Sequence, residues 1–336
     1  MSQFVPRLEA AGFRTRTSPF FSDRYLARYF ADGTKDKREA LASYRQRLGI
    51  MARQKADVLW IEKEAFPFLP AFAERLISNG RTPYVVDFDD AVFHTYDRSN
   101  SGVVRAILGE KLKPLIRNSS AIFAGNDYLA NYAREAGART ILSVPTVVEP
   151  ARYPLRGNAK DGPVRIGWIG TPANARYLAP CVAAMNALAD RHRLELVTIG
   201  ADRVPDVVGP QQNLAWSEES EGELLSQIDI GVMPLTDTRW ERGKCGYKLI
   251  QYMAAGKPVI ASPVGVNATI VTPEVGFLAA DHAGWIAALD QLAGDRALRS
   301  RMGEAARQRV ENKYSVEAIA PTIVNAFRTI TGLTAE

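Results

Sequence analysis

The chain has 336 residues, a length that predicts two domains, because a single hydrophobic core seldom grows beyond about 250 to 300 residues. Hydrophobic residues make up 46% and charged residues 24%, which excludes a disordered or fibrous chain, and no stretch reaches the roughly 20 apolar residues that span a bilayer. The charge is uneven, because residues 1–160 carry 25 Lys and Arg against 17 Asp and Glu, a net charge of +8, whereas the remainder carries 17 against 20.

In the first half, short apolar runs alternate with amphipathic segments. The runs, which predict strands, lie at 58–61, 84–86, 121–124 and 140–144. The segments that predict helices lie at 38–54, 68–79, 103–117 and 127–136. Strands this short and apolar, each followed by a helix, predict a parallel sheet that is buried on both faces.

The second half repeats the pattern after a stretch at 145–163 that is rich in Pro, Gly and charge and is typical of a hinge. Strands are expected at 164–169, 194–199, 228–232 and 258–261. Helices are expected at 175–189, 219–226, 244–254, 282–293 and 295–312. The fold class is therefore α/β with two doubly wound units, and ligands bind at the carboxyl ends of the strands in such sheets.

The segment 240–267 (WERGKCGYKLIQYMAAGKPVIASPVGVN) carries the strongest chemical signal. It predicts a Gly-containing loop followed by a helix from about Lys244, and a helix N-terminus is suited to a diphosphate. Lys244 and Lys248 are four residues apart and would share one helical face, where they could neutralise a leaving nucleoside diphosphate. Gln251 could hydrogen-bond a ribose. The alternative is a solvated lysine pair on an ordinary surface helix.

This segment, together with 166–172 (IGWIGTP) and 229–235 (DIGVMPL), resembles the C-terminal domain of family 4 (group 1) glycosyltransferases. In the first half, 121–137 (AIFAGNDYLANYAREAG) and 143–146 (SVPT) are similar to the corresponding elements of that family. The resemblance implies the GT-B fold, in which two Rossmann-like domains face a central cleft, a nucleotide-sugar donor and transfer with retention.

The resemblance also implies a domain division. An N-terminal acceptor-side domain is expected at 1–148, a hinge at 149–162, a nucleotide-sugar domain at 163–314, and a C-terminal helix at 315–336 that returns to the first domain. Related enzymes begin with an apolar strand and a Gly-rich loop, and the first strand is expected to be missing here.

Two departures from the family concern the donor. Most members carry two glutamates eight residues apart, and Gly243 and Gln251 stand at those positions here. The family's phosphate-binding Arg and Lys after the first strand are absent, so that Lys244, Lys248 and Arg176 would supply the positive charge.

Several turns complete the expected donor site. Gly170 and Thr171 end a strand and could offer backbone N–H groups to a phosphate, or could form a plain turn. The turn of Gly265, Val266 and Asn267 resembles the one beside the donor phosphates. Trp216 occupies the stretch that holds the base in related enzymes, although a core Trp fits it nearly as well.

Catalytic candidates follow the strands of the first half. Asp89 and Asp90 align with a His-Asp pair of the family and are candidate bases or groups that orient the acceptor hydroxyl or the donor sugar. Asp87 is expected to cap the turn that follows. Glu64 ends the preceding strand and could face the same cleft, and His94 could exchange a proton near neutrality or be a surface residue. Three close aspartates resemble a metal site, but the family implies that no metal is needed.

The leading function is a hexosyltransferase of surface-polysaccharide biosynthesis that uses a nucleoside-diphosphate sugar, without another cofactor, on a glycan or lipid-linked acceptor. Alternatives are a non-catalytic partner that binds nucleotide or glycan, and a nucleotide-sugar epimerase. A two-lobed solute-binding protein would need a signal peptide.

The location and partners follow from composition. Residues 1–13 lack a signal-peptide pattern, and Cys181 and Cys245 are too few for a disulfide framework, so a cytoplasmic location is expected. The basic half could contact an anionic membrane at its inner face, hold a phosphorylated ligand, or be a solvated surface. No nucleic acid is expected, because no Lys/Arg run carries interleaved aromatics.

Overall fold

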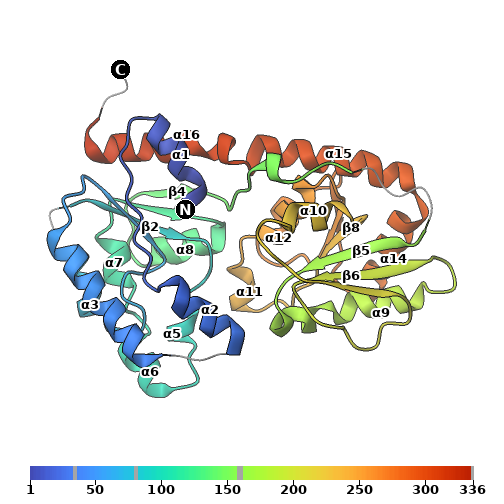
Figure 1. The fold of residues 1–336 in the computed structure, drawn as a ribbon, viewed down its shortest axis with the longest axis horizontal. Coiled ribbons are helices and arrows are strands. Elements are labelled where there is room, and N and C mark those ends of the chain that lie inside the picture. Colours follow the sequence, from blue (N-terminus) through green and yellow to red (C-terminus); the bar gives the residue numbers. More distant parts are fainter. Residues whose placement is uncertain (33–35, 79–81, 157–161, 334–336) are drawn as a thin grey trace. The chain divides into compact units, whose positions relative to one another are not determined.

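The computed structural model describes residues 1–32, 36–78, 82–156 and 162–333 (Figure 1). The chain folds into two compact units. Unit 1 consists of Met1–Val144 and Ala320–Glu336, and unit 2 consists of Pro145–Ile319.

Unit 1 is built on a four-stranded parallel sheet in the order β1-β2-β3-β4. Its strands are β1 Leu59–Glu62, β2 Tyr84–Phe88, β3 Ala121–Ala124 and β4 Ile141–Ser143. Its helices are η1 Ser2–Phe4, α1 Val5–Ala10, α2 Asp23–Asp32, α3 Lys37–Arg53, α4 Ala71–Ser78, α5 His94–Asp97, α6 Gly102–Leu108, α7 Lys113–Arg117 and α8 Asp127–Glu135. All four predicted strands form, and the central strands β2 and β3 are buried along nearly their whole length, as expected for a parallel sheet that is covered on both faces.

One predicted helix of unit 1 is broken. The segment expected as a single helix at 103–117 forms α6 and α7 with a turn between them. Gly109 follows α6, and Pro114 stands in the first turn of α7, where its missing N–H costs no helical hydrogen bond.

Unit 2 is built on a six-stranded parallel sheet in the order β10-β9-β8-β5-β6-β7. Its strands are β5 Val164–Ile169, β6 Leu194–Ile199, β7 Gln211–Leu214, β8 Ile230–Met233, β9 Val259–Ala261 and β10 Gly276–Leu278. Its helices are η2 Pro150–Arg152, η3 Pro172–Leu178, α9 Ala179–Ala187, α10 Glu221–Ser226, α11 Arg239–Arg242, α12 Tyr247–Ala254, α13 Asn267–Ile270, α14 His282–Gly294 and α15 Arg296–Lys313.

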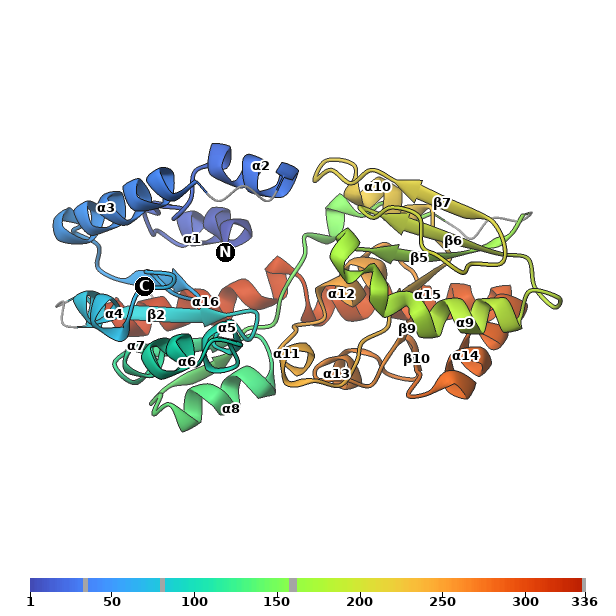
Figure 2. The same ribbon diagram turned by 90° about the horizontal axis from the view of Figure 1, so that it is seen from below.

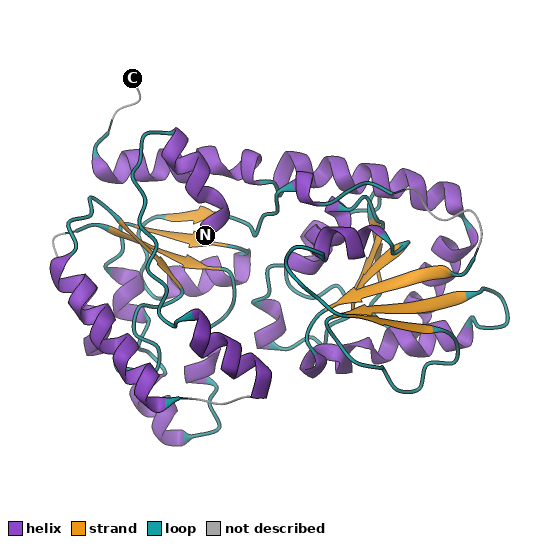
Figure 3. Cartoon of the chain, in the orientation of Figure 1, coloured by secondary structure: helices purple, strands orange, loops and turns teal. Residues whose placement is uncertain are grey.

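The two outermost strands of unit 2 were not expected from the sequence. Edge strand β7 reads QQNL and has no apolar run. Edge strand β10 has only three residues and begins with a glycine. The central strands separate two hydrophobic clusters, with Trp168 in one and Ile169 in the other. Figure 3 shows helices on both faces of this sheet.

The expected hinge is largely packed into unit 2. Val148 forms a parallel bridge with Ser315, and the Tyr153 side chain is buried in the core of the unit. The Arg307 guanidinium also donates to the Tyr153 carbonyl at 3.0 Å. Residues 149–156 are therefore held in place, while residues 157–161 of the predicted hinge lie outside the described residues.

The last helix, α16 Val316–Thr331, begins in unit 2 and continues in unit 1. In unit 1 the Phe327 ring lies 5.4 Å from Trp60 and 5.9 Å from Phe123 between ring centroids. Among the described residues no strand precedes β1, and no described helix is long and apolar enough to cross a membrane.

Candidate functional site

The carboxyl edge of the unit 2 sheet gathers several predicted site residues. Gly170 follows β5, Gly200 follows β6 and Trp216 follows β7. A side chain at Gly200 would place its Cβ 3.2 Å from Trp216 Cβ and 3.0 Å from the Gly170 carbonyl oxygen, so the three turns touch. Parallel strands end at one edge, which is why residues 46 positions apart meet here.

Lys248 lies at this edge, on the first turn of α12. Its Nζ is 4.1 Å from the centroid of the Trp168 ring, and a Cβ at Gly170 would stand only 2.6 Å from Nζ. Burial, with a further contribution from the nearby charge of Lys244, lowers the pKa of Lys248 to about 7. Among the described residues no carboxylate pairs with its ammonium group, so the site has a partly buried cation without a counter-ion.

Lys244 is not on the helix, and this corrects the expectation from the sequence. α12 begins at Tyr247, after a left-handed Gly246 with φ of 68°. Lys244 lies in the turn between α11 and α12, where its backbone N–H donates to the Glu241 carbonyl at 3.1 Å. The two lysines are still close enough to interact electrostatically, but through the turn and not through a shared helical face.

Gln251 is buried, 2% exposed, inside a polar cluster beside the same edge. Glu221 is the centre of this cluster, because its carboxylate accepts from the Tyr153 hydroxyl and from Trp216 Nε1, each at 2.8 Å. Gln251 lies near the Tyr153 hydroxyl, and its Nε2 has no hydrogen-bond partner among the described residues. Trp216 is thus not a core residue: it is 51% exposed and is fixed at its indole nitrogen.

The turn of Gly265, Val266 and Asn267 packs against the turn before α12. A Cβ at Gly246 would lie 3.3 Å from Val266 Cγ1, and Gly265 is left-handed with φ of 54°. Asn267 is 1% exposed, and its amide donates to the Ser262 carbonyl at 3.2 Å. The Asn267 side chain therefore braces the turn, and does not support the expected role beside the phosphates.

The exposed end of η3 carries Thr171 and Arg176. Thr171 Oγ1 accepts from Asn174 at 3.1 Å, and the Arg176 guanidinium stacks 5.1 Å from the Tyr177 ring. The Tyr177 hydroxyl in turn donates to Glu241, which is 5% exposed.

Glu241 is a carboxylate that the expected site did not include. Burial raises its pKa, but hydrogen bonds from Thr238 and Tyr177 outweigh that effect and hold the pKa below its usual value. It lies two residues before Gly243, so an ionised carboxylate is present near the position where the family's first glutamate is absent. In the sequence, only its position two residues before Gly243 could have identified Glu241 as a candidate site residue.

In unit 1, Asp89 and Asp90 follow β2 at the carboxyl edge of the sheet. Asp89 forms an ion pair with Lys63, with Nζ and Oδ1 3.1 Å apart and both side chains more than a third exposed. Lys63 is left-handed, with φ of 63°, and its backbone N–H donates to the Asp87 carbonyl at 2.8 Å. Asp90 Oδ1 accepts from the Ala91 N–H at 2.9 Å, so Asp90 also shapes the turn.

Asp87 does not cap that turn. Its Oδ2 accepts from Trp60 Nε1 at 3.1 Å. Burial, and next the charge of Asp89, raise the pKa of Asp87 to about 7. Asp87 can therefore carry a proton near neutral pH.

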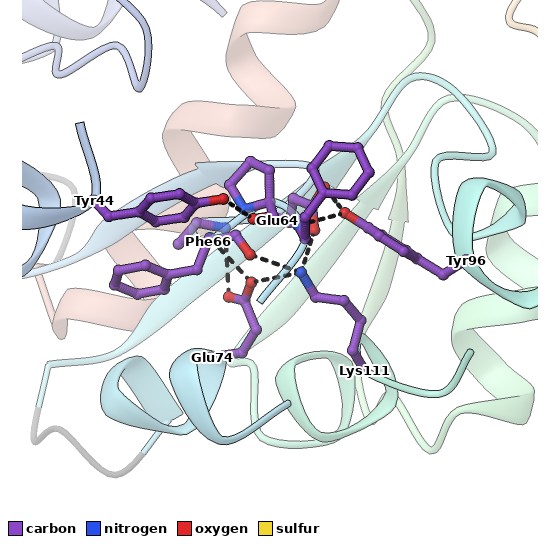
Figure 4. Close-up of polar contacts among 9 residues, drawn as sticks. Tyr44, Glu64, Phe66, Glu74, Tyr96 and Lys111 are labelled. Atoms are coloured by element: carbon purple, nitrogen blue, oxygen red, sulfur yellow. Dashed lines mark hydrogen bonds and ion pairs between the residues drawn. The ribbon is translucent and has the colours of Figure 1, made fainter. Parts of the chain in front are cut away.

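The Glu64 carboxylate is part of a buried ion-pair cluster, in which both of its oxygens have hydrogen-bond donors (Figure 4). Its two oxygens accept from the Tyr96 hydroxyl and from Lys111 Nζ, each at 2.6 Å. Lys111, 1% exposed, also donates to the Phe66 carbonyl at 2.7 Å and lies 3.5 Å from Glu74. Glu64 therefore anchors a core lysine, which argues against its expected role as a base.

His94 is not a surface residue either. It is 9% exposed, with Nδ1 2.8 Å from Asp97 Oδ1 and Nε2 2.7 Å from the Tyr128 hydroxyl. The tautomer with Nδ1–H satisfies both contacts, because the carboxylate can only accept and the phenol then donates. Tyr128 follows β3, at the same sheet edge as Asp90, and the sequence did not identify it as a site residue. Only folding joins it to His94.

Within the described residues, no group of three or more His, Cys, Asp or Glu side chains is arranged to hold a metal ion.

Residues 163–295 match the family profile described as "Glycosyl transferases group 1", whereas no curated protein sequence matches the chain. The structure is similar to sucrose-phosphate synthase (tll1590) from Thermosynechococcus elongatus, with a TM-score of 0.69 and 15% identity over 90% of this chain and 81% of that one.

Two further structures resemble the chain. HepE (Alr3699) of Anabaena, solved with UDP and glucose, has a TM-score of 0.61 and 13% identity over 86% of this chain and 82% of that one. TarM of S. aureus, solved as a mutant with UDP, alpha-GlcNAc-glycerol and Fondaparinux, has a TM-score of 0.60 and 13% identity over 86% of this chain and 59% of that one. The expected fold class is confirmed: two α/β units on parallel sheets have the GT-B fold.

Proposed function

We propose that the protein transfers a hexosyl group from a nucleoside-diphosphate sugar to a glycan or lipid-linked acceptor, and the match of residues 163–295 to the group 1 glycosyltransferase profile supports this. The observation that carries the proposal is Lys248, a partly buried ammonium without a carboxylate beside the glycine-lined ends of β5 and β6. An anion completes such a site, since an unpaired charge is costly to bury. The diphosphate of the donor fits the charge.

The neighbouring groups suit the rest of a nucleotide. The exposed face of Trp216 can stack on a base, and the unpartnered Nε2 of Gln251 can donate to a ribose hydroxyl. Lys244 and Arg176 add positive charge, and the N–H groups near Gly170 and Gly265 can approach the phosphates. The structures solved with UDP, HepE and TarM, agree with a uridine nucleotide as the first donor to test.

In the proposed reaction, the lysines stabilise the charge that develops on the leaving diphosphate. Asp90, or Asp89 once it leaves Lys63, would orient or deprotonate the acceptor hydroxyl. We propose transfer with retention and without a metal. The sugar would enter a surface polysaccharide, and the basic N-terminal half would contact the inner face of an anionic membrane.

The test is a panel of UDP- and GDP-sugars incubated with the wild type, with Lys248→Met, and with Lys313→Met as a control. Lys313 is an exposed lysine of the same unit, so both variants lose one positive charge. Sugar transfer or donor hydrolysis by the wild type and the control, with loss in Lys248→Met, supports the proposal. Equal activity in all three removes Lys248 from the mechanism.

The remaining points have separate measurements. The anomeric configuration of the product, read by NMR, tests retention. Activity in EDTA is expected to persist, and its loss would return the aspartates to consideration as metal ligands. Asp90→Asn is expected to reduce turnover with little effect on donor affinity, and an unchanged rate would exclude Asp90 as the base.

A non-catalytic nucleotide-binding partner is the second candidate. It is favoured by Gly243, which has no carboxylate, and by Glu64, whose carboxylate is bound to Lys111. Binding of a nucleotide sugar without transfer or hydrolysis, across the same panel, would support this candidate over the enzyme.

A further inference from the structure

A basic groove lies on the outer side of unit 1, between α3 and the segment that connects α1 to α2. Its volume is about 460 Å³, and it is lined by Arg16, Arg45, Gln46, Gly49, Ile50, Arg53 and Gln54. In Figure 2, α3 lies at the periphery of the unit with the dark blue N-terminal segment beside it. Three of the seven lining residues are arginines and none is acidic, so the groove has the charge of an anion site.

Among the described residues, the three arginines of the groove have no counter-ion. Arg16, Arg45 and Arg53 are exposed, and among the described residues none of them forms an ion pair with a carboxylate. Arginine presents up to five donors in a planar fork that matches phosphate oxygens. Three such groups on one groove favour an anion with several oxygens over a single carboxylate.

The convergence of Arg16 with α3 is fixed by packing. Arg47 donates to the Ser18 carbonyl at 2.9 Å and stacks 5.7 Å from the Phe20 ring. Phe20 also lies edge-on to Tyr44, with centroids 4.9 Å apart. These contacts hold the segment around Arg16 against α3, so the groove is a built feature of the unit.

Gly49 lines the groove, and packing does not require a glycine there. Gly49 is inside α3, where glycine costs about 1 kcal/mol relative to alanine, and a Cβ there would meet nothing within 4 Å. Its effect is to leave the groove open between Arg45 and Arg53.

The outer face of α3 places apolar side chains beside this groove. Leu41 and Leu48 are 52% and 44% exposed. Residues 41, 45 and 48 have the i, i+4, i+7 spacing that forms one stripe, so Arg45 lies between two exposed leucines. Apolar and basic side chains on one exposed helix face are typical of contact with a lipid surface.

We propose that this groove binds a phosphate or diphosphate group and, resting on the proposed function, that the group belongs to the acceptor. The donor diphosphate is assigned to Lys248 in unit 2, so the groove is a second, separate anion site. The phosphate can be carried by a lipid headgroup or by a soluble phosphorylated glycan, and Leu41 and Leu48 favour the lipid.

The first experiment measures inorganic pyrophosphate binding by calorimetry. The wild type is expected to show two sites. Arg45→Gln/Arg53→Gln weakens one of them at least about thirtyfold, equal to about 2 kcal/mol, whereas Lys248→Met removes the other. The control Arg98→Gln/Arg139→Gln removes the same charge from two exposed arginines of unit 1 and keeps both sites.

A second variant separates binding from folding. Gly49→Leu places a side chain in the groove without changing charge, and is expected to keep or raise the melting temperature while it removes the same site. The proposal is overturned if both groove variants keep two sites, or if the control loses as much affinity as Arg45→Gln/Arg53→Gln. Loss of the Lys248 site alone is a result about the donor and leaves the groove unaffected.

Vesicle sedimentation identifies the source of the phosphate. With vesicles of phosphatidylglycerol and phosphatidylcholine, the wild type is expected to sediment more than with phosphatidylcholine alone. Leu41→Gln/Leu48→Gln should lose sedimentation and keep pyrophosphate binding. If the protein does not sediment but keeps both pyrophosphate sites, the phosphate is not carried by a lipid headgroup, and a soluble phosphorylated acceptor is supported.

Discussion

Unit 1 contains the buried Lys111 and unit 2 the partly buried Lys248, and these two lysines have opposite surroundings. Lys111 in unit 1 lies between the carboxylates of Glu64 and Glu74 and donates to the Phe66 carbonyl. Lys248 in unit 2 has an aromatic ring at 4.1 Å and, among the described residues, no carboxylate. Both sit beside helices that cover a parallel sheet.

The difference separates a structural charge from a functional one. The Lys111 cluster supplies its own counter-ions, and removal of its central charge would leave two carboxylates buried together. At Lys248 the protein holds a poorly solvated cation without an ion pair among the described residues. A bound anion would offset this desolvation cost. A diphosphate is such an anion.

The largest expected effect concerns Lys111. Lys111→Met is expected to lower the free energy of unfolding by about 3 to 5 kcal/mol, because Glu64 and Glu74 lose their shared cation. Burial already raises the pKa of Glu74 above its usual value, and Lys111 opposes that rise. Urea denaturation measures the change.

Lys113 provides the matched control for that experiment. Lys113 lies two residues after Lys111 and pairs with Glu110 at the surface, where both side chains are more than a third exposed. Lys113→Met is expected to cost less than about 1 kcal/mol. Equal losses in the two variants would show that burial does not distinguish these pairs.

The second prediction is that Lys248→Met separates binding from stability. Loss of a charge-assisted contact is expected to weaken UDP binding by about 2 kcal/mol, roughly thirtyfold, with little effect on uridine. The free energy of unfolding should be unchanged or higher at pH 6, since a poorly solvated charge is removed. Calorimetry with both ligands decides, and equal losses for UDP and uridine would contradict the phosphate contact.

The third prediction concerns pH. The folded-state pKa of Lys248, about 7, lies below its unfolded value of 10.5, so the folded protein binds fewer protons between these values and its stability rises with pH across that window. A diphosphate favours the protonated lysine, so UDP-sugar affinity should fall above pH 7 by up to about tenfold per pH unit. Lys248→Met should show neither dependence, and a parallel pH profile in that variant would refute the assignment.

The fourth prediction concerns Asp87, which is the acidic counterpart of Lys248. Its folded pKa of about 7 is above the usual 3.8, so its contribution to stability is present below pH 3.8 and is lost as the pH rises toward 7. Asp87→Asn should become more stable relative to the wild type as the pH rises from 4.5 to 8, because only the wild type has to ionise a buried carboxyl. Thermal melts across this range test it, and a constant difference would show that Asp87 does not titrate there.

Local sequence was sufficient for the strands that are buried on both faces. The predicted runs at 121–124, 164–169 and 194–199 coincide with β3, β5 and β6, because strands that are covered on both faces are mostly apolar. The helix that carries Lys248 was also expected, but its start at Tyr247 was not. The turn before it depends on a left-handed Gly246, and periodicity does not reveal that conformation.

The sequence by itself determined the two α/β units and the lysine-bearing segment that suits a diphosphate. Tertiary structure decided which charged residues remain available. Glu64 is occupied by a lysine 47 positions later, and His94 by a tyrosine 34 positions later. Lys248 stands beside a glycine and a tryptophan about 80 positions earlier. Burial and ion pairing depend on neighbours that only the folded chain brings together. Residue type and spacing therefore cannot distinguish a charged side chain that is already paired within the protein from one that is available to a ligand.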